Sequence, residues 1–235
     1  MDNRIQYLKW DSDFFEKKIG RIDVDYYTDL NTLLNDAKKA GYQLIYIFGG
    51  QDLYIDDEVL RKFNGLFADR KILYEKDIGS TNMALPLVSE YTNKELVSEL
   101  EQLAFESGKY SRFKLDKNFK ENDFFKMYNI WVANSINHQI ADKVFIVMEN
   151  NQIKGMVTLK INEDYGQIGL IAISPNSQGK GYGRALIAAC ENELFNKHIS
   201  KLEVSTQLKN KQASLFYEKC GFTIKTITNI YHFWI

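Results

Sequence analysis

Three glycines stand at alternate positions immediately before a helix-like apolar pattern. Gly179, Gly181 and Gly183 lie in the segment GKGYGR, together with Lys180 and Arg184. Glycine lets the main chain approach a ligand without a Cβ atom in the way, and the unpaired N–H groups of a helix's first turn attract phosphate oxygens. The two basic side chains would add positive charge to such a site. The segment is therefore a candidate phosphate-binding loop, although a sharp turn would use the same glycines.

The glycine spacing excludes two common nucleotide-binding motifs. A P-loop requires Gly-Lys followed by Ser or Thr, which does not occur in this segment, and a dinucleotide-binding loop requires G-x-G-x-x-G inside a βαβ unit. Here the segment GKGYG follows short strands whose pattern predicts an antiparallel arrangement. Spacing alone therefore leaves both the phosphate-binding loop and the structural turn open.

A second candidate binding segment is the linker SGKYSRFKLDKNF, which mixes basic and aromatic side chains. Arginine can form paired hydrogen bonds with a phosphate group, and an aromatic ring can stack on a nucleobase. An ordinary solvated loop would have a similar composition. If the linker binds a ligand, its candidate contacts are Tyr110, Ser111, Arg112 and Phe113.

The elements that would position these segments alternate between strand and helix patterns. Residues 1–88 read as a small α/β domain, and a break around Pro86 places a domain boundary before a second domain at 89–235. In the first domain we expect strands at 19–27, 42–49 and 72–78, and helices near 30–41 and 56–66. In the second we expect helices from 93, at 121–136, from about 182 and at 211–219, an antiparallel meander at 143–150, 152–161 and 166–174, and strands at 201–207, 222–228 and 231–235.

The composition limits the classes of protein that this chain can be. With 235 residues, of which 45% are hydrophobic, the chain can bury a substantial core. Its formal charge of −1 provides no global positive field for nucleic acid or an anionic membrane. The N-terminal sequence lacks a signal-peptide pattern and the apolar runs are too short to cross a bilayer, so we expect a cytoplasmic protein. Two cysteines and three widely spaced histidines predict neither a disulfide framework nor a metal site.

The glycine segment and its surroundings resemble the acetyl-CoA signature of the GNAT family of N-acetyltransferases. That signature, Arg/Gln-x-x-Gly-x-Gly/Ala, is matched by Gln178, Gly181 and Gly183, after the strand LIAIS and Pro175. The later segment NKQASLFYEKCGF, from 210 to 222, resembles the family's second conserved element. The resemblance spans about residue 90 to the C-terminus. It implies a GNAT fold of the α/β (α+β) class, with a mixed, mostly antiparallel sheet flanked by helices, and residues 1–88 as a partial GNAT-like half.

The resemblance also implies roles for individual residues. The strand that ends at Ile173 would splay from its neighbour and bind the pantetheine arm through main-chain groups, and the Ile173 N–H would polarise the thioester carbonyl. Tyr217 would be the general acid, because a phenol of pKa ~10 can protonate a thiolate whose thiol has a pKa of ~8.5, although packing in the core would also explain a tyrosine here. The implied acetyl-CoA contacts are Ile171, Ile173, Gln178, Gly179, Lys180, Gly181, Tyr182, Gly183, Arg184 and Asn210.

Two of these assignments leave alternatives. Asn210 could simply be the N-cap of the following helix. Of the carboxylates expected near the site, Glu163, Asp164 and Glu203, none is assigned as a general base, because an amine deprotonated by solvent could attack directly through ordered water.

Shorter segments extend the resemblance to one subgroup, the dTDP-4-amino-4,6-dideoxygalactose N-acetyltransferases. These segments are WDSDFFEKKIGRI, YSRFK and VSTQLKNKQASLFYEKCGF. The subgroup implies a nucleotide-linked amino sugar as acceptor, destined for a cell-surface polysaccharide, and the linker at 110–113 as its binding segment. The aromatic residues Trp10, Phe14 and Phe15 would equally serve as the inward anchor of a small domain.

Other functions remain open. The acceptor could be a polyamine, an antibiotic or a protein N-terminus, and the first domain could mediate a homodimer instead of shaping a substrate site. A non-catalytic domain that senses acetyl-CoA or binds a partner is the alternative from another class. The retained tyrosine at 217 weighs against it, because such a domain needs no general acid.

Overall fold

The computed structural model describes residues 5–25, 29–79 and 87–235. The break expected around Pro86 lies outside the described residues. The chain divides into two compact units, one made of residues 1–72 and 226–235 and the other of residues 73–225. This division differs from the expected boundary after residue 88, because the C-terminal residues pack with the N-terminal ones. Two long strands, β4 (Gly65–Asp77) and β10 (Thr223–Phe233), contribute residues to both units.

The first unit is a small α/β layer. Its strands pair in the order β1-β2-β3-β10-β4, with β2 parallel to β3 and the β1–β2 and β3–β10 pairs antiparallel. Its elements in chain order are β1 (Gln6–Tyr7), α1 (Lys9–Phe15), β2 (Ile19–Asp23), α2 (Leu30–Lys39), β3 (Leu44–Gly50) and α3 (Asp57–Lys62). The Asp29 side chain caps α2 by accepting from the Thr32 N–H, and Asp56 caps α3 in the same way.

The core of the first unit lies between the helices and the sheet. The alternating apolar side of β2 and β3 packs against one face of α2, as the 3.6-residue period requires. The C-terminal strand completes this core with two aromatic rings. The buried cluster consists of Ile22, Leu33, Leu34, Ala37, Ile45, Ile47, Ile55, Phe63, Tyr231 and Phe233.

The second unit contains the antiparallel meander that the sequence predicts. Strands β6, β7 and β8 pair antiparallel, with one register shift in each of the two ladders, and β8 pairs with β9 in parallel. The order continues from β9 to β4 on one side and from β6 to β5 on the other. The strands are β5 (Val88–Glu90), β6 (Lys143–Glu149), β7 (Gln152–Ile161), β8 (Gly166–Ile173) and β9 (Lys201–Gln207).

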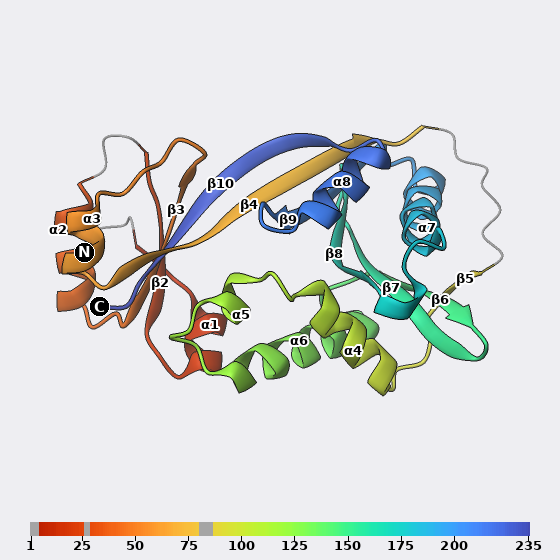
Figure 1. Ribbon diagram of the computed structural model, residues 1–235, viewed down its shortest axis with the longest axis horizontal. Helices are drawn as coiled ribbons and strands as arrows, with labels where there is room; N and C mark the ends of the chain where they lie inside the picture. The colour runs from red at the N-terminus through yellow and green to blue at the C-terminus, as the bar shows by residue number, and fades with distance from the viewer. Residues whose placement is uncertain (1–4, 26–28, 80–86) are drawn as a thin grey trace. The chain divides into compact units, whose positions relative to one another are not determined.

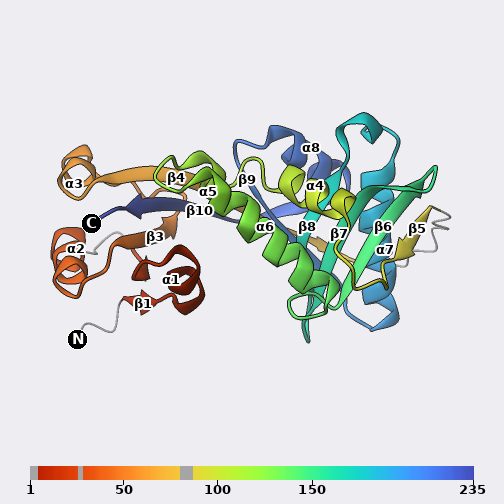
Figure 2. The same ribbon diagram turned by 90° about the horizontal axis from the view of Figure 1, so that it is seen from below.

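Helices cover both faces of this meander. Figures 1 and 2 show α4 and α6 together on one side of the strands and α7 on the other. Helix α4 packs on β7 and β8, and α7 packs on β6, β7 and β8. Gly166 lets α7 approach closely, since a Cβ atom there would collide with Leu194. The helices are α4 (Ser98–Ser107), α5 (Arg112–Leu115), α6 (Glu121–Ile136), α7 (Tyr182–Asn196) and α8 (Lys211–Lys219), with a short 3₁₀ turn at Pro175–Ser177.

Some expected elements differ from the observed ones. The two strands expected at 222–228 and 231–235 are one continuous strand, β10, because its polar residues Asn229 and His232 are buried and do not end it. The linker after α4 contains the short helix α5, which the Ser111 side chain caps. Trp10 is not an inward anchor, since 42% of it is exposed and its ring stacks on Phe14 within α1.

In the described ranges 5–25, 29–79 and 87–235, the longest apolar helices fall short of what a membrane crossing needs. Within the same ranges, no group of three or more His, Cys, Asp or Glu side chains is arranged to hold a metal ion.

A buried asparagine of β10 should be important for the stability of the first unit. Asn229 is 2% exposed, donates to the Gln51 and Leu53 carbonyls and accepts from Arg70. Asn229→Ala leaves these groups without partners, so we expect a loss of about 2–4 kcal/mol in the free energy of unfolding. Urea denaturation measures it. The matched control is Asn31→Ala, which removes an exposed hydrogen bond to Lys62 and should cost under about 1 kcal/mol; equal losses in both variants would contradict the prediction.

Candidate functional site

The parallel pairing of β8 with β9 ends well before either strand does. In the part of the chain that the structure describes, it runs from Gly166↔Leu202 to Ile168↔Val204. Residues 169–173 of β8 and 205–207 of β9 continue without pairing to each other, so the two strands form an open wedge. Main-chain groups that face such a gap need other partners, and a ligand can supply them.

A β-bulge marks the place where the wedge opens. The β7–β8 register shifts between Val157 and Leu159, so β8 carries one extra residue opposite Thr158. The Thr158 hydroxyl accepts a hydrogen bond from the Leu170 N–H at 2.8 Å, which satisfies the N–H displaced by the bulge. The bulge is therefore built into the strand, with a buried partner of its own.

The alternation of the β7–β8 ladder sets the direction of the main chain beyond the bulge. The Ser174 N–H donates to the Lys154 carbonyl at 2.8 Å, so this opposed pair is a hydrogen-bonded one. The next pair, Gly155↔Ile173, is then non-hydrogen-bonded, and the same holds for the pair that contains Ile171. The N–H and C=O groups of Ile171 and Ile173 therefore point away from β7, toward the wedge.

An unpartnered hydroxyl lies on the other arm of the wedge. Ser205 is the first β9 residue beyond the last pair with β8. Its Oγ atom is buried and has no hydrogen-bond partner among the described residues. Buried hydroxyls normally have partners, so this one is consistent with a site that a ligand completes.

The glycine loop follows β8 and leads into α7. Gly179 and Gly181 have φ angles of +79° and +84°, the left-handed region that favours glycine. No atom lies within 4 Å of a Cβ built on either glycine, so the loop is open on its outer side. Gly183 differs, because it lies inside α7 and a Cβ there would press on the Phe216 ring of α8. The loop thus presents bare main chain at the N-terminus of a helix, where anions bind.

Two side chains of the loop already have a partner. Lys180 donates to both carboxylate oxygens of Glu149 at 2.9 Å, and the Tyr182 hydroxyl donates to the same carboxylate at 2.8 Å. These hydrogen bonds, first from Lys180 and then from Tyr182, lower the pKa of Glu149. Tyr182 is 7% exposed and packs in the unit's core. An incoming phosphate would compete with Glu149 for the Lys180 ammonium group.

Gln178 joins the glycine loop to the end of β8 and to α8. Its amide group donates to the Ile173 carbonyl at 3.4 Å and accepts from the Gln212 amide of α8 at 3.1 Å. Asn210, two residues earlier, accepts from the Ala213 N–H at 3.2 Å and is the N-cap of α8. The N-cap role is thus observed for Asn210, and its side-chain NH₂ group is not needed for that role.

Tyr217 lies on the inner face of α8. It is 4% exposed, and its ring centroid lies 5.5 Å from that of Phe216 and 5.7 Å from those of Tyr74 and Phe222. Burial raises the pKa of its hydroxyl, with smaller contributions from Cys220 and Tyr74. The phenol therefore keeps its proton throughout the physiological pH range.

Arg184 lies near the same region on α7. It is exposed and stands beside Cys220, the residue that follows α8. Burial raises the pKa of the Cys220 thiol, and the Arg184 and Lys76 charges partly offset that effect. The guanidinium group is thus placed near α8, one turn from the glycine loop.

The predicted acceptor segment forms the short helix α5 at its centre. Ser111 is 5% exposed and accepts from the Phe113 N–H, so it serves as the N-cap. The Arg112 guanidinium lies 4.3 Å from the centroid of the Phe113 ring, and both side chains are partly exposed. Tyr110 is also partly exposed and lies under the Lys109 ammonium group. The four residues are close together, but only three of them present side chains to a ligand.

The three carboxylates expected near the site have different environments. Glu163 and Asp164 lie in the exposed turn between β7 and β8. Glu203 is 6% exposed, opposes Gln167 at the closed end of the wedge, and accepts from Lys225 at 2.7 Å. Of the three carboxylates, Glu203 is the one that is buried and that lies next to the wedge.

Several residues of the site were not assigned a role from the sequence. Tyr74 of β4 packs against Tyr217, and its hydroxyl donates to Glu218 at 3.3 Å. Glu149 holds Lys180, and Gln212 contacts Gln178. Glu218 and Gln212 lie inside the segment that the sequence singled out, whereas Tyr74 is separated from it by more than half the chain.

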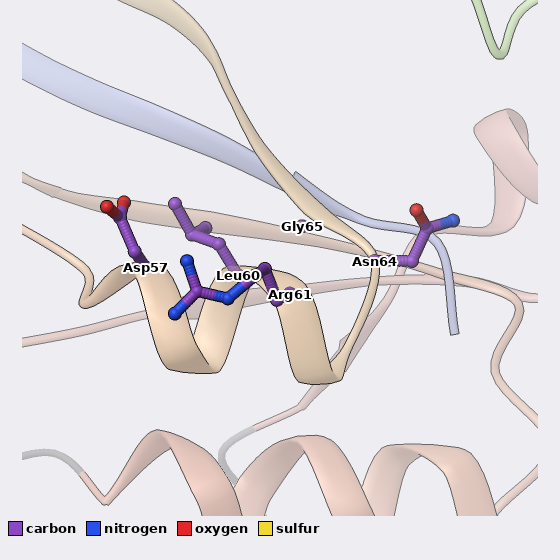
Figure 3. A pocket seen from close by; sticks show the side chains of 5 residues that line it. All are labelled: Asp57, Leu60, Arg61, Asn64 and Gly65. Carbon is purple, nitrogen blue, oxygen red and sulfur yellow. The ribbon is translucent and has the colours of Figure 1, made fainter.

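A hollow in the first unit is not part of this site. It has a volume of about 410 Å³ and lies beside α3, as Figure 3 shows. Its lining is mostly exposed and includes one aspartate and one arginine, without a nucleophile or a buried polar group. The lining residues are Asp57, Leu60, Arg61, Asn64 and Gly65.

Comparison with protein families identifies the part of the chain that contains the wedge. Residues 118–222 match the acetyltransferase (GNAT) family. The matched range contains β8, the glycine loop and the helix that carries Tyr217.

Curated relatives are similar over parts of the chain. The spore coat polysaccharide biosynthesis protein SpsD of Bacillus subtilis is 25% identical over 133 residues, which are 57% of this chain and 46% of that protein. N-alpha-acetyltransferase 30 of Schizosaccharomyces pombe is 25% identical over 43% of this chain and 71% of its own length. The [ribosomal protein bS18]-alanine N-acetyltransferase of Escherichia coli K12 is 27% identical over 37% of this chain and 60% of that protein. The chain thus spans about half the length of the first of these relatives.

Solved structures share the fold at low sequence identity. A conserved protein of unknown function from Staphylococcus epidermidis aligns over 100% of this chain and 92% of its own, with a TM-score of 0.68 and 14% identity. A GCN5-related N-acetyltransferase from Sphaerobacter thermophilus aligns over 97% of this chain and 74% of its own, with a TM-score of 0.56 and 10% identity. The expected fold class, a mixed and mostly antiparallel sheet flanked by helices, is confirmed.

Proposed function

We propose that this chain, in which residues 118–222 form an acetyltransferase domain of the GNAT family, transfers the acetyl group of acetyl-CoA to a primary amine. The observation that carries the proposal is the open wedge between β8 and β9, which leads directly to the glycine loop. Main-chain donors and acceptors line one arm of the wedge, and a helix N-terminus stands at its end. This arrangement suits a ligand with an amide-rich arm and a diphosphate.

The residues of the wedge fit acetyl-CoA on structural grounds. The pantetheine arm contains amide groups that can pair with the main chain of Ile171 and Ile173, as a missing strand would. The open space above Gly179 and Gly181 accommodates a diphosphate against main-chain N–H groups. Arg184 can pair with a phosphate, and Lys180 can do so after it leaves Glu149. The NH₂ group of Asn210 offers one further donor.

The chain's own groups then provide what acetyl transfer requires. Acetyl-CoA supplies the acetyl group as a thioester, which a neutral amine attacks at the carbonyl carbon. The Ile173 N–H is a fixed donor for the negative charge that develops on the carbonyl oxygen. Tyr217 donates its proton to the departing thiolate sulfur, so that a neutral thiol leaves. Because burial raises the pKa of Tyr217, it is fully protonated at neutral pH but is a weaker acid than a free phenol.

For the acceptor, we propose a nucleotide-linked amino sugar such as a dTDP-4-amino-4,6-dideoxygalactose, made for a cell-surface polysaccharide. Two observations support it. The relative SpsD is named for spore coat polysaccharide biosynthesis. The paired Arg112 and Phe113 on α5, with Tyr110 beside them, offer a cation and rings to a nucleotide diphosphate.

A second acceptor class, the amino terminus of a protein, has support from different relatives. Two of the similar proteins are named as an N-alpha-acetyltransferase and as a [ribosomal protein bS18]-alanine N-acetyltransferase. Both align only within part of this chain. An acceptor screen by mass spectrometry, with acetyl-CoA and either amino sugar nucleotides or short peptides, separates the two classes.

Binding of coenzyme A tests the proposal most directly. We expect calorimetry to detect binding to the wild type, and about tenfold weaker binding to Gly181→Ala, because a Cβ atom strains a left-handed residue and changes the loop. The matched control is Gly41→Ala, which strains a residue with a φ of +78° in the first unit and should bind normally. A folded wild-type protein that releases no heat with coenzyme A would rule out the transferase.

The role of Tyr217 has a separate test. Tyr217→Phe keeps the buried ring and removes the acid, so we expect kcat to fall by roughly tenfold or more, with little change in the Kd for acetyl-CoA. Thiol release during turnover measures kcat. Tyr231→Phe, at another buried tyrosine, should leave kcat unchanged. A fully active phenylalanine variant at 217 would remove that residue from the proton pathway.

The acceptor segment is tested through the Michaelis constant. Arg112→Ala should raise the KM for the amino sugar nucleotide about tenfold, since a charge-assisted contact to phosphate is lost, and should leave acetyl-CoA binding intact. Lys117→Ala removes an exposed charge from the same segment and serves as the control. Equal KM values in the Arg112 variant and the wild type would refute the assignment of the segment.

A further inference from the structure

Tyr217 belongs to a buried pair of tyrosines that reaches the surface through a carboxylate. Tyr74 of β4 is 1% exposed, and its ring centroid lies 5.7 Å from that of Tyr217. The Tyr74 hydroxyl donates to the Glu218 carboxylate at 3.3 Å. Glu218 follows Tyr217 directly in the sequence but lies on the exposed side of α8. The Tyr74 ring is thus buried against Tyr217, and its hydroxyl contacts a solvent-exposed carboxylate.

A buried general acid needs a way to recover its proton. Once a phenol has protonated a leaving thiolate, a phenoxide remains in a poorly solvated site, and burial makes that anion costly. Around Tyr217 lie also the rings of Phe216 and Phe222, which carry no exchangeable proton, and the partly buried thiol of Cys220, whose pKa burial raises. Tyr74 is the hydroxyl-bearing neighbour with a contact to an exposed carboxylate.

From this geometry we infer that Tyr74 and Glu218 form a proton relay that restores the proton of Tyr217 after each acetyl transfer. The inference rests on the proposed function, in which Tyr217 is the general acid. Tyr74 acts through Tyr217, so it is a positioning residue and not a catalytic one.

The protons balance along this route. An ammonium acceptor loses two protons in the reaction, one when it becomes a neutral amine and one when the amide forms. The sulfur gains one proton from Tyr217, and the O–H bond of Tyr217 is reformed with the proton of Tyr74, directly or through one water. The Tyr74 oxygen then takes a proton from solvent by way of the Glu218 carboxyl group. The net reaction releases one proton to solvent, and no electron changes hands.

Charged groups near the pair come from three elements and restrict where the proton can go. Lys76 of β4 pairs with Glu191 of α7, and its ammonium group lies 5.9 Å from the centroid of the Phe222 ring. Arg184 of α7 stands beside Cys220. Both groups are cations and favour negative charge nearby. Glu218 is the carboxylate in contact with the Tyr74 hydroxyl.

A double-mutant cycle tests the relay. Tyr74→Phe keeps the ring and removes the hydroxyl, so we expect kcat to fall about fivefold or more with an unchanged Kd for acetyl-CoA, and the solvent deuterium isotope effect on kcat to rise. In the Tyr217→Phe background the same change should lower kcat by less than about twofold, because the relay then has no acid to serve. Glu218→Gln keeps an acceptor for the Tyr74 hydroxyl but cannot carry a proton, and should lower kcat in the same direction.

The controls separate a relay from mere support of the fold. Tyr231→Phe removes a buried hydroxyl in the first unit and should leave kcat and its isotope effect unchanged. A wild-type kcat in Tyr74→Phe overturns the inference. So does a loss that persists undiminished in the Tyr217→Phe background, or full activity in Glu218→Gln, since either result assigns Tyr74 a structural role.

Failure of the relay is distinguishable from failure of the proposed function. If the wild type binds no coenzyme A, the transferase itself is wrong, whatever the Tyr74 variant does. If the wild type turns over and Tyr217→Phe is impaired while Tyr74→Phe is not, the transferase stands and only the relay falls. Thermal unfolding of each variant, expected near the wild-type Tm, confirms that the comparison concerns folded protein.

Discussion

The site depends on the loss of hydrogen bonding between two neighbouring parallel strands. A parallel ladder normally continues for the length of its strands, because unpaired main-chain groups are costly. Here β8 and β9 separate after Ile168↔Val204, and the bulge opposite Thr158 turns the following residues of β8. The hydroxyl of Thr158 satisfies the N–H that the bulge displaces, so the strand keeps its pairing to β7 while its other edge opens. One side chain thus helps to open an edge of β8 whose main-chain groups can accept other partners.

The role of the glycine loop depends on the wedge, because the loop continues directly from β8. Residues in the left-handed region turn the chain sharply from the end of β8 to the start of α7, and they do so without side chains that would fill the space. Gln178 hydrogen-bonds to the Ile173 carbonyl at the end of β8 and to the Gln212 amide of α8. The loop is therefore fixed at its base by side-chain hydrogen bonds and open at Gly179 and Gly181, as a site for an anion must be.

Local pattern predicted much of the fold, and long-range pairing explains what it missed. The helix at 121–136, the helix at 211–219 and the meander strands are visible in the sequence because their periodicity is local. The continuity of β10 is not visible in the sequence, because the burial of this strand depends on its pairing with β3, which lies far away in the chain. The glycine loop and Tyr217 could be predicted because each lies in a short segment that resembles a known motif. Tyr74 could not be predicted in this way. It contacts Glu218 of α8, which lies 144 positions later in the chain, and no local pattern encodes such a contact.

In the proposed reaction, the burial of Tyr217 has two opposite effects on its action as an acid. A raised pKa keeps the phenol protonated, so the acid is ready at any physiological pH, yet it also makes proton donation to a thiolate less favourable. The phenoxide that results is unstable in that site, and rapid return of a proton would prevent the reverse transfer from the thiol. A buried tyrosine in contact with an exposed carboxylate meets this need at small cost to packing, since Tyr74 contributes its ring to the core whether or not its hydroxyl carries protons. The same residue can therefore serve stability through its ring and turnover through its oxygen, and only the removal of the oxygen separates the two.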